Sequence, residues 1–248
     1  MQSTMTSSLP FQDRQVLVSG GTSGIGAGIA HAFLQAGARV TLTGATAPEV
    51  ERARSDPLLA GAAVQLLDVR QADQVQACVA QFHQLNVLVN CAGVIRRGQE
   101  HDPEVFGEVL DINVQGTMRL CTGARALLAQ SRGCIINTAS MLSFFGGGLV
   151  PAYSASKGAV AQLTKSLAIA YAPDGVRVNA IAPGWIATPL TQALQEDAAR
   201  SAVILGRTPM ARWGTPADVA GPVLFLASPA AAFVTGVILP VDGGYLIT

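Results

Sequence analysis

The sequence predicts a single α/β domain built on a doubly wound, seven-stranded parallel sheet with helices on both faces. Three observations lead to this fold class. Short apolar runs alternate with longer segments of helical periodicity. These runs are continuous rather than alternately polar, which is typical of strands buried on both faces of a parallel sheet. No Ser-, Gly- or Pro-rich linker divides the 248 residues, so one domain covering 1–248 is expected.

The expected elements alternate along the chain, and right-handed crossovers place the helices on both faces. The expected strands are Gln15–Ser19, Arg39–Thr43, Ala63–Leu67, Val87–Val89, Cys134–Asn137, Val176–Ala180 and Val237–Pro240. The expected helices are Ile25–Ala36, Gln71–Gln84, Pro103–Ala129, Ala152–Ala172 and Pro216–Ala227. Segment 184–212, with a polar helical middle, is too long for a simple connection, and we expect a substrate lid there.

Composition narrows the functional classes. Sixteen basic and sixteen acidic residues give a formal net charge of zero, which argues against nucleic acid or an anionic membrane as partner. The four cysteines have no CxxC spacing and the three histidines are dispersed, so no metal site is expected and the cysteines are interpreted as free thiols in the cytoplasm. Residues 1–10 lack the features of a secretory signal and are expected to be a loose lead-in. Segment Ala220–Val241 is uncharged, but its prolines favour a buried helix followed by a strand over a membrane span.

A glycine-rich segment, Ser19-Gly20-Gly21-Thr22-Ser23-Gly24-Ile25-Gly26, follows the first strand and opens the first helix. Glycines permit a tight turn and let a pyrophosphate approach the backbone, while the helix N-terminus offers N–H donors and a positive dipole. A tight strand–helix connection is the alternative interpretation of such a turn. Its place between the first strand and the first helix favours a dinucleotide site.

The end of the second strand commonly distinguishes the two nicotinamide dinucleotides. An acid there binds the ribose 2′-hydroxyl, and a base accommodates a 2′-phosphate. Here the strand turns through Gly44-Ala45-Thr46 with neither charge, although Arg52 or Arg54 could fold back, so NAD(H) and NADP(H) both stay open. Asp68 ends the third strand, where it could accept from an adenine amino group or cap the helix beginning at Gln71.

Tyr153 and Lys157 lie four residues apart in a helical segment, a spacing that puts both on one helix face. A nearby ammonium lowers the pKa of a phenol from about 10 toward working pH. Such a tyrosine can act as general acid or base on an alcohol or carbonyl oxygen. An amphipathic surface pair is the alternative explanation for the spacing.

Two further polar residues are candidates for the same site. Ser140 follows the strand Cys134–Asn137 and so lies at the carboxyl edge of the sheet, where a hydroxyl can donate to a substrate oxygen or simply serve a turn. Asn113 interrupts the apolar stretch Leu110–Val114. A buried Asn needs partners, which a helix kink or a held water would supply; a solvent-facing Asn is the alternative.

Taken together, these residues resemble the short-chain dehydrogenase/reductase family over essentially the whole chain. The matching elements occur in the family's order: the loop Gly20–Gly26, Asp68, Asn90-Cys91-Ala92-Gly93, Asn113, Ser140, Tyr153 with Lys157, Asn179, and Pro183-Gly184 with Thr188. The chain departs from the family pattern where Cys91 replaces an Asn, where Ser19 replaces a Thr, and where the second strand lacks an acid.

The resemblance implies a Rossmann fold and a set of roles. Tyr153 would be the general acid/base, Lys157 would bind the nicotinamide ribose and lower the pKa of the tyrosine, Ser140 would polarise the carbonyl and Asn113 would hold a relay water. The residues expected to contact the cofactor are Gly20, Ser23, Gly24, Ile25, Gly26, Gly44, Asp68, Val69, Asn90, Ala92, Gly93, Tyr153, Lys157, Pro183, Gly184, Ile186 and Thr188. The resemblance also implies a homotetramer.

Within the family the chain is similar to bacterial sugar-acid dehydrogenases such as the 2-dehydro-3-deoxy-D-gluconate 5-dehydrogenases and, less closely, the gluconate 5-dehydrogenases. The segments that carry this likeness are Gly93–Arg97, Ala139–Phe144, Val150–Tyr153 and Arg212–Gly214. An Arg at the cofactor edge can grip a carboxylate with paired hydrogen bonds, or it can simply be solvated. The residues expected to contact the substrate are Arg96, Ser140, Leu142, Tyr153 and Trp185.

The favoured hypothesis is an NAD(P)-dependent oxidoreductase that transfers a hydride between nicotinamide and a hydroxy or keto sugar acid. One alternative is a 3-oxoacyl-carrier-protein reductase, which shares these motifs but would want a basic docking surface for its acidic carrier. Another is a dinucleotide-sensing regulator without catalysis, against which the complete Asn113, Ser140, Tyr153 and Lys157 set argues.

Overall fold

The computed structural model describes residues 9–248, so most of the expected lead-in, residues 1–8, lies outside the described residues. Within the described range, one parallel sheet has the strand order β3-β2-β1-β4-β5-β6-β7. The strands are β1 (Gln15–Ser19), β2 (Arg39–Gly44), β3 (Ala63–Leu66), β4 (Val87–Asn90), β5 (Cys134–Thr138), β6 (Arg177–Pro183) and β7 (Ile238–Val241). The order reverses between β1 and β4, which confirms the doubly wound sheet and the seven strands expected.

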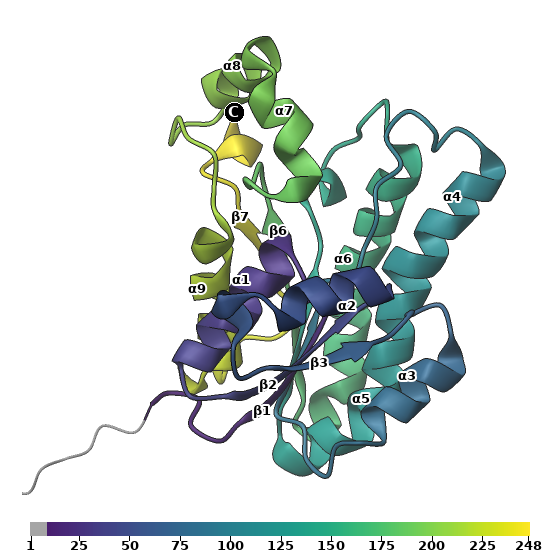
Figure 1. Cartoon of the computed structure of the whole chain (residues 1–248), viewed down its shortest axis with the longest axis vertical. Coiled ribbons are helices and arrows are strands. Elements are labelled where there is room, and N and C mark those ends of the chain that lie inside the picture. Colours follow the sequence, from purple (N-terminus) through teal and green to yellow (C-terminus); the bar gives the residue numbers. More distant parts are fainter. Residues whose placement is uncertain (1–8) are drawn as a thin grey trace, which may run out of the picture.

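Helices cover both faces of this sheet (Figure 1). The main helices are α1 (Gly24–Gln35), α2 (Ala47–Arg54), α3 (Ala72–Val79), α4 (Pro103–Leu110), α5 (Thr117–Ser131), α6 (Pro151–Tyr171), α7 (Gln192–Glu196), α8 (Ala198–Arg207) and α9 (Pro216–Ala227). Helix α1 packs against α9 on one face, while α3, α5 and α6 lie on the other. In segment 184–212, α7 and α8 lie at the same end of the molecule as the chain's C-terminus (Figure 1).

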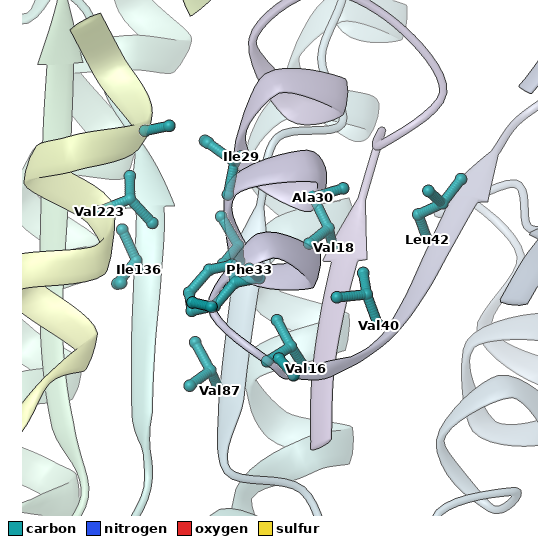
Figure 2. Packing of buried hydrophobic residues seen from close by; sticks show 14 of the residues in the cluster. Val16, Val18, Ile29, Ala30, Phe33, Val40, Leu42, Val87, Ile136 and Val223 are labelled. Carbon is teal, nitrogen blue, oxygen red and sulfur yellow. The ribbon is translucent and has the colours of Figure 1, made fainter. Parts of the chain in front are cut away.

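The core divides into two layers because successive strand residues point to opposite faces of the sheet. Val16 and Val18 of β1 pack with Ile29 and Phe33 of α1 on one face (Figure 2). Leu17, between the two valines, packs into the layer on the opposite face. All three β1 residues are fully buried, as expected for a strand covered on both sides. The resulting rigid sheet holds the carboxyl ends of its strands in a fixed array.

The predicted helix Pro103–Ala129 is wrong as one continuous helix. It is interrupted by a π-helical turn, Asp111–Gly116, between α4 and α5. Asn113 lies in that turn, and its side chain bonds to the backbone of Val94 outside the helix. A wider turn of this kind re-aims a side chain, and such turns are frequent at functional sites. Asn113 is therefore buried with its partners at this turn, and a solvent-facing Asn is excluded because this residue is 1% exposed.

Two further helices differ from the prediction. Helix α2 was not expected, although Thr46 and Glu49 form a complete capping box with a proline at the start of the helix. Helix α3 ends at Val79, five residues before the predicted end. The uncharged segment Ala220–Val241 divides between α9 and β7, and no helix among the described residues is long and apolar enough to span a bilayer.

Candidate active site

A cleft of about 560 Å³ lies along the carboxyl ends of β1 to β5. The glycine-rich turn forms one wall, and Tyr153 and Lys157 of α6 lie at the other end. Of the residues expected to contact a cofactor, those that line this cleft are Gly20, Ser23, Gly24, Ile25, Gly26, Gly44, Asp68, Val69, Ala92, Gly93, Tyr153, Lys157 and Thr188. Residues far apart in the sequence thus converge on one surface.

Four residues expected to contact the cofactor do not line the cleft. Asn90 is buried beneath it, where its amide donates to Asn137 Oδ1 at 2.9 Å. Pro183 and Gly184 end β6 and its turn, and Gly184 packs so closely on Asp242 that a side chain would not fit. Ile186 points into a second cavity on the side of β7. These positions support the cleft rather than line it.

The glycine-rich turn has the geometry of a phosphate cradle. Gly20 and Gly24 have φ angles of +66° and +54°, a region that side chains disfavour. A Cβ at Gly20 would lie 2.6 Å from Ala92 Cα, and one at Gly26 would overlap the carbonyl of Gly20. Since the backbone is bare here and Ser23 precedes the N-terminus of α1, an anion can approach the free N–H groups.

The sequence indicated no charge at the end of β2, but the structure places one there. Glu49 from α2 reaches back to line the cleft. Its Oε2 accepts from the backbone N–H of Ala45 at 2.9 Å and of Thr46 at 3.3 Å. Arg52 bonds to the carbonyl of Pro48 instead of turning into the cleft. Glu49, three residues beyond Thr46, therefore supplies an acid at the end of β2 that the strand itself lacks.

Asp68 also faces the cleft, but it does not cap α3. Its carboxylate receives two hydrogen bonds from Arg70 Nε at 3.0 Å and one from Arg70 Nη2 at 2.7 Å. These bonds hold the pKa of Asp68 below its usual value. Asp68 is therefore ionised and already neutralised by its own arginine.

Tyr153 and Lys157 point toward one another, which excludes the surface-pair interpretation. Lys157 Nζ lies 5.4 Å from the centroid of the Tyr153 ring. The ammonium donates to the carbonyl oxygen of Thr138, at the end of β5, at 2.6 Å. Lys157 is only 5% exposed, so its ammonium is buried at the cleft, where it contacts the Thr138 carbonyl and lies near the Tyr153 ring.

The expectation that the ammonium brings the tyrosine pKa toward neutrality is wrong for this structure. Burial raises the pKa of Tyr153 to about 12, and a hydrogen bond with Ser140 only partly opposes it. Burial also lowers the pKa of Lys157 to about 8, so its charge is itself disfavoured. Desolvation is therefore the main cause of both pKa shifts, and the phenol holds its proton at neutral pH.

Ser140 combines both of its possible roles. Its Oγ accepts from the backbone N–H of Leu142 at 3.1 Å and so caps the short 3₁₀ turn Met141–Ser143. The same hydroxyl lies near enough to the phenol of Tyr153 to lower its pKa. The two hydroxyls together form a proton-donating pair at the carboxyl end of β5.

Asn113 organises the region beneath the tyrosine. Its Oδ1 accepts from Val94 N at 2.8 Å, and its Nδ2 donates to Val94 O and to Ser156 Oγ, both at 3.0 Å. Ser156 in turn donates to the carbonyl of Tyr153 at 2.7 Å. Asn113 therefore ties the segment after β4 to the first turns of α6, where the reactive phenol lies.

Glu100 is a site residue that the sequence analysis missed. It is fully buried, its Oε1 accepts from the backbone N–H of Arg96 and its Oε2 from that of Tyr153, each at 2.7 Å. The carboxylate thus caps the N-terminus of α6, where the helix dipole favours negative charge. No local pattern marks Glu100, because it reaches α6 from 53 residues earlier in the chain.

The expected substrate residues separate in the structure. Arg96 lines the cleft, but its Nη2 is paired with Glu108 Oε1 at 2.8 Å, while Arg97 is solvent-exposed. Trp185 does not face the cleft; it lines a second cavity, of about 540 Å³, with its ring 6.0 Å from that of Trp213. The predicted contact of Trp185 with the substrate therefore stays a prediction.

The parallel sheet carries a bare glycine turn at one end of its cleft and the partly buried phenol of Tyr153 beside the buried Lys157 ammonium at the other. This arrangement defines a dinucleotide-dependent oxidoreductase. A family profile described as Enoyl-(Acyl carrier protein) reductase matches residues 20–246. The 2-dehydro-3-deoxy-D-gluconate 5-dehydrogenase of Bacillus subtilis is 42% identical over 95% of this chain and 96% of its own length. Galactitol 2-dehydrogenase (L-tagatose-forming) of Cereibacter sphaeroides is 40% identical over 93% and 94%.

Among solved structures, one named as an NAD(P)-dependent gluconate 5-dehydrogenase from Beutenbergia cavernae, with NADP bound at low occupancy, has a TM-score of 0.89. It is 39% identical and covers 98% of this chain and 100% of its own. The chain belongs to the short-chain dehydrogenase/reductase family. It is accordingly an NAD(P)-dependent oxidoreductase that acts on CH–OH groups.

Proposed function

We propose that the protein interconverts a hydroxy and a keto sugar acid of the 2-dehydro-3-deoxy-D-gluconate kind. The names of the relatives from Pseudoalteromonas atlantica and Bacillus subtilis support this substrate class. The observation that carries the chemistry is the phenol of Tyr153 at the cleft, with the buried Lys157 ammonium 5.4 Å from its ring and the Ser140 hydroxyl acting on its pKa. Arg96 lines the same cleft and would bind the substrate carboxylate. Its guanidinium would then bond both to that carboxylate and to Glu108.

The cleft fits an NAD(P) dinucleotide, because its glycine turn leaves room only for bare backbone and presents a helix N-terminus. When bound, the nicotinamide supplies or accepts the hydride. The glycine turn would hold the pyrophosphate, and Lys157 would donate to the nicotinamide ribose.

At the reacting oxygen, Ser140 would donate a hydrogen bond and Tyr153 would exchange the proton. With its pKa raised to about 12, the phenol is protonated at neutral pH and so carries the proton that reduction consumes. Oxidation needs the phenolate, which becomes available only as the pH rises. Asn113 would position Tyr153 through Ser156 and hold a relay water.

We further propose a cytoplasmic homotetramer with segment 184–212 as its substrate lid. The four free cysteines suit a reducing compartment. Exposed apolar side chains, namely Ile169, Phe225, Phe233 and Ile247, would be covered by neighbouring subunits. Analytical ultracentrifugation tests the assembly: a single species of one chain at micromolar concentration contradicts it.

The decisive assay is turnover of a panel of keto sugar acids and one short 3-oxoacyl thioester with NADH and NADPH. We expect reduction of the sugar acids, and a loss of about 10³-fold or more in Tyr153→Phe with dinucleotide binding retained. Turnover of the thioester alone would assign the protein as an acyl reductase instead. Binding of dinucleotide without turnover of anything in the panel would favour a sensor.

A further inference from the structure

The cleft has two chemically different ends. Tyr153 and Lys157 mark the end where the nicotinamide reacts, so the adenosine half of the dinucleotide extends toward the ends of β2 and β3. This placement rests on the cofactor orientation proposed above. The charges around Gly44 and Asp68 therefore decide whether a ribose hydroxyl or a ribose phosphate is accepted there.

Glu49 is held at this end by the backbone. Two N–H groups, those of Ala45 and Thr46, bind its Oε2, while no hydrogen bond to its Oε1 is made by any described residue. Adjacent backbone N–H groups of this kind are what an anionic phosphate would otherwise use. The carboxylate thus fills an anion site with the protein's own charge, and Glu49 lines the cleft with one oxygen that no described residue bonds.

Compensating cations are lacking at the same place. Of the arginines that line the cleft, Arg70 is paired with Asp68 at 2.7 Å and Arg96 with Glu108 at 2.8 Å. Arg54 bonds to Glu51 and to the carbonyl of Val64, outside the cleft. Arg52, one turn beyond Glu49 on α2, forms no ion pair, but its Nε bonds to the carbonyl of Pro48 and it does not line the cleft. A 2′-phosphate, which carries between one and two negative charges, would therefore meet a fixed carboxylate and, among the cleft-lining residues described, only arginines already paired with an acid.

We propose that Glu49 sets the cofactor preference of this enzyme, accepting hydrogen bonds from the adenosine ribose hydroxyls and repelling a 2′-phosphate, so that NAD(H) binds better than NADP(H). The preference does not follow from resemblance, since the Beutenbergia cavernae neighbour holds NADP. It follows from an acid on α2 that substitutes for the one absent from the end of β2.

The test is the dissociation constant of NADH and of NADPH, measured by isothermal titration calorimetry without any sugar acid. For the wild type we expect NADH to bind about 10- to 100-fold tighter. Glu49→Gln keeps a hydrogen-bonding oxygen for the helix cap but removes the charge. It should bring the ratio of the two constants about 10-fold closer to one, mainly through tighter NADPH binding. Glu51→Gln, two residues along α2 and paired with Arg54, is the matched control and should leave the ratio unchanged.

The outcomes separate this inference from the proposed function. Equal affinities in the wild type, tighter binding of NADPH, or a ratio that Glu49→Gln leaves unchanged would each overturn it. Binding of neither dinucleotide would overturn the placement of the cofactor as well. A clear NADH preference that Glu49→Gln abolishes would stand as support even if no sugar acid is turned over, in which case only the substrate assignment fails.

Discussion

Glu100 offers the sharpest test of how the buried charges organise the active site. Glu100→Gln changes no shape, but it replaces one accepting oxygen with an amide that can only donate. Both carboxylate oxygens accept backbone N–H groups at 2.7 Å, so one of these donors, on Arg96 or Tyr153, would then face an NH₂ group in a fully buried site. A buried donor left without an acceptor costs about 1–3 kcal/mol, and more where the lost partner was charged.

The stability effect is measured by urea unfolding of wild type and variant at pH 7. We expect Glu100→Gln to lower the free energy of unfolding by about 2–3 kcal/mol. Glu104→Gln removes an equal charge from an exposed residue nearby and should change it by less than about 0.5 kcal/mol. A loss no larger than that of the control would refute the role of Glu100 as a buried cap of α6.

A second readout separates electrostatics from packing. The negative charge of Glu100 raises the pKa of Tyr153, so its removal lowers that pKa. Oxidation of the alcohol requires the phenolate, and its rate rises with pH as the phenol ionises. The rising limb of kcat/KM should therefore shift to lower pH in Glu100→Gln and stay in place in Glu104→Gln. A limb that moves to higher pH, or not at all, would show that Glu100 acts on Tyr153 through shape alone.

Three further predictions follow from burial and close packing. Lys157→Met should abolish turnover yet raise the free energy of unfolding by about 2 kcal/mol, because the buried ammonium destabilises the fold below its lowered pKa of about 8. This gain in the free energy of unfolding, measured by chemical denaturation, should shrink as the pH rises from 8 to 10.5 and the wild-type lysine loses its charge. Gly26→Ala should abolish NADH binding in calorimetry because its methyl overlaps the Gly20 carbonyl, whereas Gly107→Ala, in open space on α4, should stabilise by roughly 0.5–1 kcal/mol. Burial raises the pKa of all four thiols, so a colorimetric thiol reagent at pH 8 should label them only after unfolding; rapid labelling of the folded protein would contradict this.

Much of the framework was predictable because strand and helix periodicity is local information. The seven strands, the glycine turn and the alignment of Tyr153 with Lys157 on one helix face all follow from residues close together in the chain. The π-helical turn at Asn113 could not be specified from the sequence, since the partner of the Asn113 side chain, Val94, lies nineteen residues away in the chain. The placement of Trp185 beside a second cavity was not predictable for a related reason: the direction of a side chain after β6 depends on what packs around it.

The amino-acid order alone determined the α/β class, the single parallel sheet and the residue types that carry redox chemistry, because these depend on spacing along one segment. The folded chain decided the electrostatics. Burial reversed the expected direction of the Tyr153 pKa, and distant segments brought Glu100 to the start of α6 and Glu49 to the end of β2. Charge–charge energies and desolvation depend on distances and burial in three dimensions, which no local pattern specifies.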